Sequence, residues 1–152
     1  MRLNSNGALV LQGGSTSASG VGVAFPATQS ASSDANTLDD YEEGTWTPTI
    51  STSGGAITSY SSSGTYVKVG RLVTITFSFT VTNYTGGSGT GLIGALPFTS
   101  SSTGISGAYR ESGTTGAIHT LAYSTSTILS SFASTAWTTG STGAASVSYI
   151  TS

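Results

Sequence analysis

The carboxylates of this chain are concentrated in one short segment. Four of them lie within the five residues Asp39-Asp40-Tyr41-Glu42-Glu43, Asp34 lies just upstream, and Glu111 is the sixth acid. A cluster of this kind can form a solvated turn, pair with cations of another subunit, bind a hard cation, or supply the acid and base of a glycosidase. We favour pairing between subunits, because Lys68, Arg71 and Arg110 in the rest of the chain could bind these carboxylates from a neighbour.

The other three interpretations have weaker support. Asp34, Asn36, Asp39 and Asp40 offer oxygen ligands, but their spacing is not that of a complete calcium loop, so no metal site is predicted. Paired-carboxylate catalysis is disfavoured because the acids lie in a linker, outside any element that would hold them in place. A solvated turn remains open.

The remaining chemical groups are few. His119 is the single histidine, there is no cysteine, and only 7% of the 152 residues are charged. His119 lies between Ile118 and Thr120 in a predicted strand, and we expect a structural or surface histidine. We therefore expect no catalytic residue and no cofactor, and the chain is not predicted to be an enzyme. Four Lys and Arg and a net charge of −2 argue against nucleic-acid binding. No apolar run approaches the roughly 20 residues of a membrane helix, so no membrane insertion is expected.

The distribution of charge divides the sequence into an arm and a head. Residues 1–44 hold one arginine and five acids, whereas residues 45–152 hold three basic residues and one acid. The arm has too few large apolar residues for a core of its own. We expect an extended anchor that adds to a neighbouring subunit or a larger assembly as strands. Its predicted interface residues are Leu9, Val10, Leu11, Val21, Val23, Phe25, Asp39, Asp40, Tyr41, Glu42, Glu43 and Trp46.

The head is predicted to be all-β. Residues 73–82 alternate apolar and hydroxyl side chains without a break, which indicates a half-buried strand with its odd positions in the core. Residues 66–69 precede it through a turn at Gly70-Arg71 that is short enough for a hairpin. Further strands are predicted at 92–96, 104–109, 117–123, 127–132 and 146–151. Short strands at this spacing favour a β-sandwich of jelly-roll type.

Two groups of aromatic residues are informative. Phe77 and Phe79 lie on the core side of the alternating strand. Five others lie in or near Gly/Ser loops and are candidates for exposure: Tyr60, Tyr84, Tyr109, Tyr123 and Trp137. Of these, Tyr84, Tyr109 and Trp137 are candidates for stacking on a glycan.

One segment, Asn36-Thr37-Leu38-Asp39-Asp40-Tyr41-Glu42-Glu43-Gly44-Thr45-Trp46-Thr47-Pro48, resembles a module that recurs in virion proteins of tailed bacteriophages. The resemblance extends to residues 25–29, 66–70 and 96–98. It implies a homotrimeric protein of the virion surface, made in the bacterial cytoplasm, in which this segment marks the start of a β-sandwich head.

Two roles follow from the resemblance. In such fibres the module usually lies near the C-terminal end of a longer chain, whereas here it begins within a few dozen residues of Met1. This favours a trimeric capsid decoration (cement) protein or a short head fibre, anchored by its arm to phage capsid or tail proteins. The alternative is a tail-fibre tip that binds a host surface glycan.

Overall fold

The computed structural model describes residues 2–3, 9–10, 22–25, 38, 40–86, 89–101, 106–113, 118–125, 127–132 and 137–151. Every regular element within these ranges is a β-strand, which confirms the prediction of an all-β protein. Among the described residues, no helix is long and apolar enough to cross a membrane. The chain separates into two compact units, Met1–Glu42 with Lys68–Gly70, and Glu43–Val67 with Arg71–Ser152.

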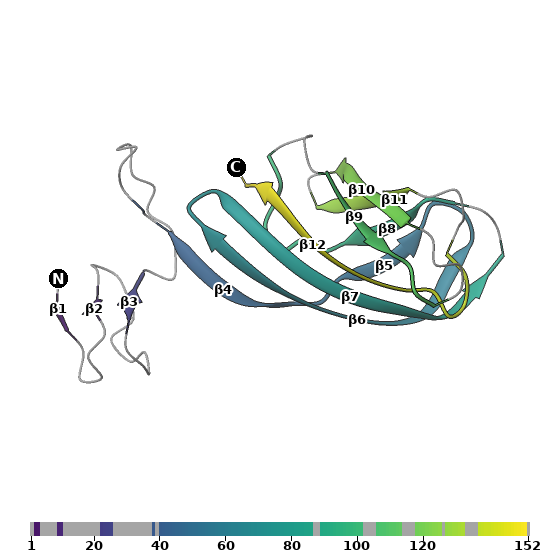
Figure 1. The fold of residues 1–152 in the computed structure, drawn as a ribbon, viewed down its shortest axis with the longest axis horizontal. Coiled ribbons are helices and arrows are strands. Elements are labelled where there is room, and N and C mark those ends of the chain that lie inside the picture. Colours follow the sequence, from purple (N-terminus) through teal and green to yellow (C-terminus); the bar gives the residue numbers. More distant parts are fainter. Residues whose placement is uncertain are drawn as a thin grey trace. The chain divides into compact units, whose positions relative to one another are not determined.

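The first sheet of the head has four strands in the order β12-β7-β6-β4 (Figure 1). Their bounds are β4 Tyr41–Trp46, β6 Ala56–Val69, β7 Leu72–Thr85 and β12 Thr142–Ile150. The strands β6 and β7 have 14 residues each and are joined by the predicted turn at Gly70-Arg71. Gly70 has a positive φ of 56°, a backbone conformation that glycine adopts at little cost. β7 and β12 pair antiparallel over nine positions, from Thr80↔Thr142 to Leu72↔Ile150.

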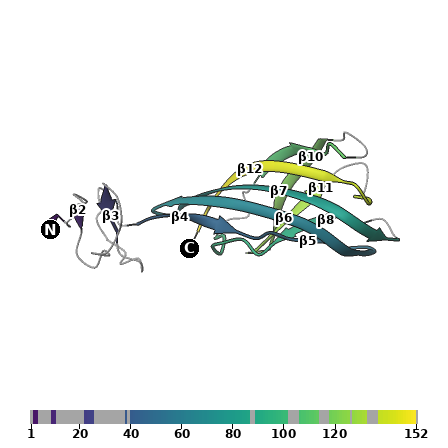
Figure 2. The ribbon, with the colours of Figure 1, turned by 90° about the horizontal axis from the view of Figure 1, so that it is seen from below.

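The second sheet has five strands in the order β5-β8-β11-β10-β9. They are β5 Thr49–Thr52, β8 Gly91–Gly94, β9 Ser106–Arg110, β10 Ile118–Thr125 and β11 Ile128–Phe132. The pairings within it are antiparallel. Figures 1 and 2 show the two sheets as two layers.

The core of the head contains side chains from both sheets. From the first sheet come the odd positions of β7, including Val73, Ile75 and Phe77, each at most 4% exposed. From the second come Ile93, Leu121 and Leu129, at most 1% exposed. Alternation along β7 is therefore confirmed, and the arrangement is consistent with a β-sandwich.

The arm contains a small sheet of its own, with three strands in the order β1-β2-β3. The strands are β1 Arg2–Leu3, β2 Leu9–Val10 and β3 Val23–Ala24. β1 and β2 pair antiparallel, whereas β2 and β3 pair parallel. The two apolar pieces of the arm thus pair with each other within one chain.

Candidate functional site

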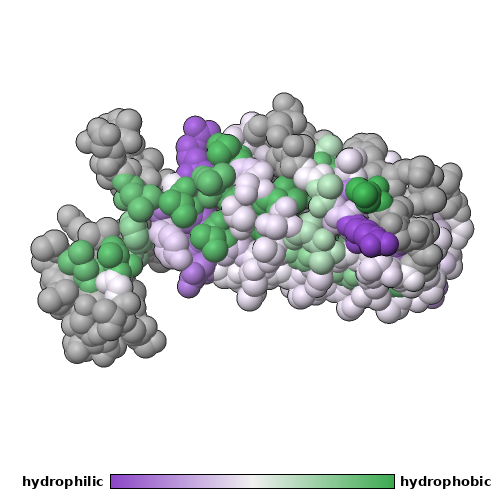
Figure 3. Space-filling view, in the orientation of Figure 1, coloured by the Kyte–Doolittle hydropathy of each residue, from purple (hydrophilic) through white to green (hydrophobic). Residues whose placement is uncertain are grey.

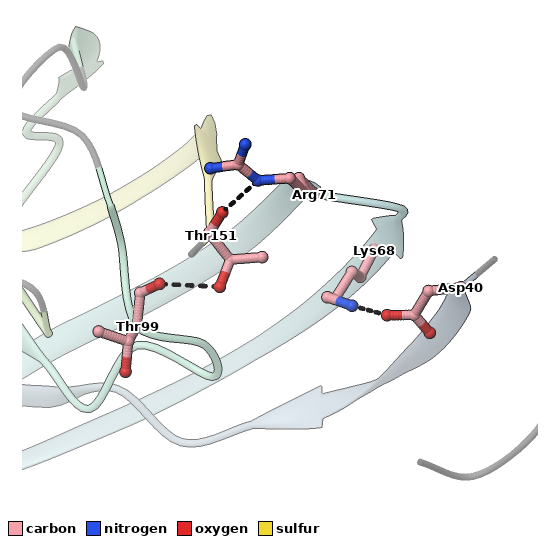
Figure 4. A network of polar contacts seen from close by, with 5 residues as sticks. All are labelled: Asp40, Lys68, Arg71, Thr99 and Thr151. Atoms are coloured by element: carbon pink, nitrogen blue, oxygen red, sulfur yellow. Dashed lines mark hydrogen bonds and ion pairs between the residues drawn. The ribbon is translucent and has the colours of Figure 1, made fainter. Parts of the chain in front are cut away.

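The acidic segment begins with a buried ion pair. The carboxylate of Asp40 contacts the ammonium of Lys68, and their side chains are only 1% and 4% exposed (Figure 4). Asp40 immediately precedes β4, and Lys68 is the penultimate residue of β6. The backbone N–H of Gly70 donates to the carbonyl oxygen of Asp40 at 2.9 Å, which holds the two segments together. The prediction that Asp40 binds a cation of a neighbouring chain is therefore wrong, because its partner lies in the same chain.

The residues after Asp40 alternate between the two faces of β4. Tyr41 and Glu43 are exposed, whereas Glu42 is half-buried. The ring of Tyr41 lies 6.1 Å from the ring of Phe25, so this part of the arm contacts the acidic segment. Among the described residues of the segment, Tyr41 and Glu43 are thus exposed to solvent.

Trp46, at the end of β4, fills a place in the core of its own chain. It is 8% exposed, its ring makes an edge contact with Phe77, and its Nε1 donates to the carbonyl of Thr76 at 3.2 Å. Gly64 on β6 leaves the room for this ring, since a Cβ there would lie 2.2 Å from Nε1. The prediction that Trp46 fills the apolar surface of a neighbour is therefore wrong.

The arm residues differ in their exposure. Val10 is 3% exposed, Leu9 and Phe25 are half-buried, and Val23 is 52% exposed. Leu11, Val21 and Asp39 lie outside the described residues, as do Asp34 and Asn36 of the cation hypothesis. Among the residues that are described, no group of three metal-ligating side chains occurs.

Two of the three candidate glycan contacts are buried, contrary to the prediction. Tyr109 is 4% exposed and Trp137 is 3% exposed, and Trp137 Nε1 donates to Tyr109 Oη at 2.7 Å. Glycines again accommodate the rings, because a Cβ at Gly91 would meet Trp137 at 2.6 Å and one at Gly143 would meet Tyr109 at 2.5 Å. Tyr84 is half-buried, and its hydroxyl donates to the carbonyl of Gly54. Tyr60 is 38% exposed, as predicted.

A second buried polar cluster surrounds His119, and no sequence motif predicted it. His119 is 2% exposed and stacks on Tyr109, with ring centroids 4.9 Å apart, while Glu111 is 1% exposed. Glu111 Oε1 accepts hydrogen bonds from the backbone N–H of Gly113 at 2.9 Å and of Thr142 at 3.4 Å. Burial lowers the pKa of His119 below its ordinary value of 6.5, and the charge of Glu111 opposes this in part. The sequence signal for this burial is the alternation of residues 118–121, which places His119 on the same face of its strand as Leu121.

The outward face of the four-stranded sheet is covered with hydroxyl groups. Side-chain hydrogen bonds link neighbouring strands in four places: Ser63 with Ser78, Thr65 with Thr76, Thr74 with Ser148, and Thr82 with Ser59. A shallow depression of about 730 Å³ lies over this sheet and is lined mainly by serine, threonine and alanine. Figure 3 shows pale residues, which have intermediate hydropathy, over much of the coloured part of the head on the side that it draws. The face therefore offers hydrogen bonds and no ionic contacts from its lining residues.

Exposed aliphatic side chains interrupt this hydroxyl surface. Val67, Leu72 and Ile150 are 41%, 47% and 38% exposed, and Leu72 is directly opposite Ile150 in the register of β7 and β12. They lie on adjacent strands at the end of the sheet where β6 turns into β7. Apolar side chains in such a group favour contact with another protein surface.

No protein-family model matches the chain, and neither a curated protein nor a solved structure matches it significantly.

Proposed function

We propose that the chain is a structural protein of a tailed-phage virion, a homotrimer of jelly-roll-like β-sandwich heads that is fixed to the particle by its N-terminal arm. Its role is assembly rather than catalysis: a capsid decoration protein or a short head fibre. The proposal rests first on the resemblance of residues 36–48 to the phage module.

The structural observation that carries the proposal is that some residues of the acidic segment are buried whereas others are exposed. Asp40 and Trp46 are buried in their own chain, whereas Tyr41 and Glu43 are exposed on β4. β4 is an edge strand of its sheet. A segment that is fixed on one side and exposed on the other, at a sheet edge, suits a contact with a neighbouring chain or a capsid protein.

The composition of the head surface also supports assembly. The outer sheet face is rich in hydroxyl groups, the residues that line its depression are uncharged, and Val67, Leu72 and Ile150 are exposed at one end of it. Protein interfaces are depleted of charge at their centre and combine apolar contacts with hydrogen bonds. The rival role, a tip that binds glycan through stacked rings, loses support because Tyr109 and Trp137 are buried.

The test is to mix the protein with purified undecorated phage heads. The full chain is expected to co-sediment with heads and to raise the temperature at which they rupture, and deletion of residues 1–25 is expected to abolish both effects. A Tyr41→Ser/Glu43→Gln variant should bind more weakly, with Tyr60→Ser as the control because Tyr60 is equally exposed but lies on β6. Binding to host cells in place of heads would contradict the decoration role and support the tail-fibre alternative.

A further inference from the structure

The contact between Asp40 and Lys68 lies where both charges are disfavoured. Both side chains are almost completely buried. Removal from water penalises an ammonium and a carboxylate alike, so the transfer of one proton from Lys68 to Asp40 within the pair costs less free energy here than it would in water. This matters chemically, because a neutral amine is a nucleophile and an ammonium is not, and a carboxylic acid accepts a nucleophile more readily than a carboxylate does.

The geometry of the contact differs from that of an ordinary hydrogen bond. Asp40 Oδ2 faces Lys68 Nζ, yet it accepts no hydrogen bond. Among the described residues, it is the one buried side-chain nitrogen or oxygen atom without a hydrogen bond. The two buried groups are therefore in contact without forming a hydrogen bond.

The backbone holds the two groups in place. The hydrogen bond from Gly70 to the carbonyl of Asp40 fixes the start of β4 beside the end of β6. Both partners therefore sit on paired backbone rather than in a loose loop. The two reacting groups therefore need no collision in solution. Holding them in place raises the effective concentration of the amine at the carboxyl group by many orders of magnitude.

We infer that Lys68 and Asp40 become joined by an intramolecular amide bond, a covalent modification formed by the folded chain itself. The lone pair of Nζ attacks the side-chain carboxyl carbon of Asp40, and a C–N bond forms. The C–O bond to the hydroxyl group then breaks, and this group leaves as water with a proton taken from the nitrogen. Nothing is oxidised or reduced, and no co-reactant is consumed.

The reaction needs a group that moves this proton from nitrogen to the leaving hydroxyl. Glu42 is suited to this proton transfer by its position. Alternation along the chain places residues 40 and 42 on the same face, and Glu42 is half-buried. Glu43 has the same carboxylate but is exposed on the opposite face. The two glutamates thus form a natural pair of test and control positions.

The mass of the unmodified full-length protein, measured after denaturation, tests the bond directly. We expect a mass lower than that of the sequence by one water. Trypsin supplies the location, because the chain has four cleavage sites, after Arg2, Lys68, Arg71 and Arg110. With the bond in place, cleavage after Lys68 is blocked and a fragment of residues 3–71 appears, one water lighter than its sequence.

Two variants are the controls for this digest. Asp40→Ala retains Lys68, so cleavage after residue 68 should return and the water should not be lost. Lys68→Arg should likewise give the full sequence mass. Should either variant fail to fold, the wild-type digest still decides the question.

Three results bear on the outcome. A wild-type mass equal to that of the sequence would overturn the bond and leave a buried ion pair. Loss of water with normal cleavage after Lys68 would also overturn it, since a succinimide at Asp40 would explain that mass. A smaller fraction of water-loss product in freshly purified Glu42→Gln than in Glu43→Gln would support the role of Glu42, and equal fractions in the two variants would overturn that role.

Discussion

Asp40 and Lys68 occupy positions from which solvent is almost absent, in a chain whose remaining charges are few. The same holds for Glu111 and His119 in the head. For such residues, the energetic consequence of a substitution depends mainly on the charge that it leaves without a partner. Two predictions belong to this scale.

Replacing Lys68 by methionine should destabilise the protein strongly. The carboxyl group of Asp40 would remain buried without its partner, and loss of one partner of a buried pair typically costs about 3–5 kcal/mol of the free energy of unfolding. Arg71→Met is the matched control, because Arg71 is exposed and its Nε donates one hydrogen bond, to the carbonyl of Thr151 at 3.0 Å. Its cost should be about 1 kcal/mol. Urea unfolding measures both, and equal costs for the two variants would show that Lys68 has no special role.

The pKa of His119 predicts a loss of stability in acid. Burial lowers this pKa below 6.5, so the unfolded chain takes up a proton at a higher pH than the folded chain does. The stabilisation is complete above about pH 6.5 and decreases as the pH falls toward the lower pKa of the folded state. The difference in melting temperature between about pH 7.5 and about pH 5.5 should be smaller in His119→Gln than in the wild type. Glu111 is retained in both proteins, and an unchanged difference would contradict the prediction.

At the scale of elements, the long hairpin of β6 and β7 shows what could be predicted from sequence. β7 was recognised because its apolar and hydroxyl residues alternate over ten positions, and the structure extends it only to Leu72–Thr85. β6 was expected at residues 66–69 but begins at Ala56. Its earlier part contains Ser61, Ser62, Ser63 and Gly64, which carry no apolar signal. Its inward face at Gly64 is covered by Trp46 from another strand, which no local pattern reveals.

The prediction that Tyr109 and Trp137 are exposed was wrong for the same physical reason. Tyr109 and Trp137 have neighbours typical of loops, but their rings fill space left by Gly143 and Gly91 on strands far away in the sequence. The candidate site shows the same limit. The sequence located the acidic segment, but the partner of Asp40 within the chain depends on the return of the chain to Lys68 through β6.

The contact between Trp46 and Gly64 leads to a prediction for these elements. Gly64→Ala should destabilise the head by about 1–3 kcal/mol, because the new Cβ would overlap Trp46 Nε1 and the carbonyl oxygen of Thr76. Ser63→Ala, one position away on the outward face, should change the stability by less than about 0.5 kcal/mol. Chemical unfolding measures both effects. A tolerated Gly64→Ala would mean that the ring of Trp46 does not lie against this strand.

For the whole molecule, the exposed aliphatic residues bear on assembly. We expect a trimer in solution, detectable as its molar mass by light scattering. A Leu72→Ser/Ile150→Ser variant should associate at least roughly tenfold more weakly, because burial of each large apolar side chain contributes about 1.5–3 kcal/mol. Ile118→Ser is the control, since Ile118 is 72% exposed but lies on β10 in the other sheet. A monomeric wild type would contradict the trimer, and equal effects of both variants would place the interface elsewhere.

The pairing of β7 with β12 also sets the order in which the chain can fold. Thr74 and Ser148, which share a hydrogen bond across these strands, are 74 positions apart in the sequence. During synthesis, β7 leaves the ribosome long before β12 has been made. Its valine, isoleucine and phenylalanine side chains therefore remain without the β12 strand during that time. Contacts between such distant positions slow folding and lengthen the time in which apolar strands can aggregate. The serines and threonines that alternate with these apolar residues keep one face of β7 hydrophilic until β12 is available.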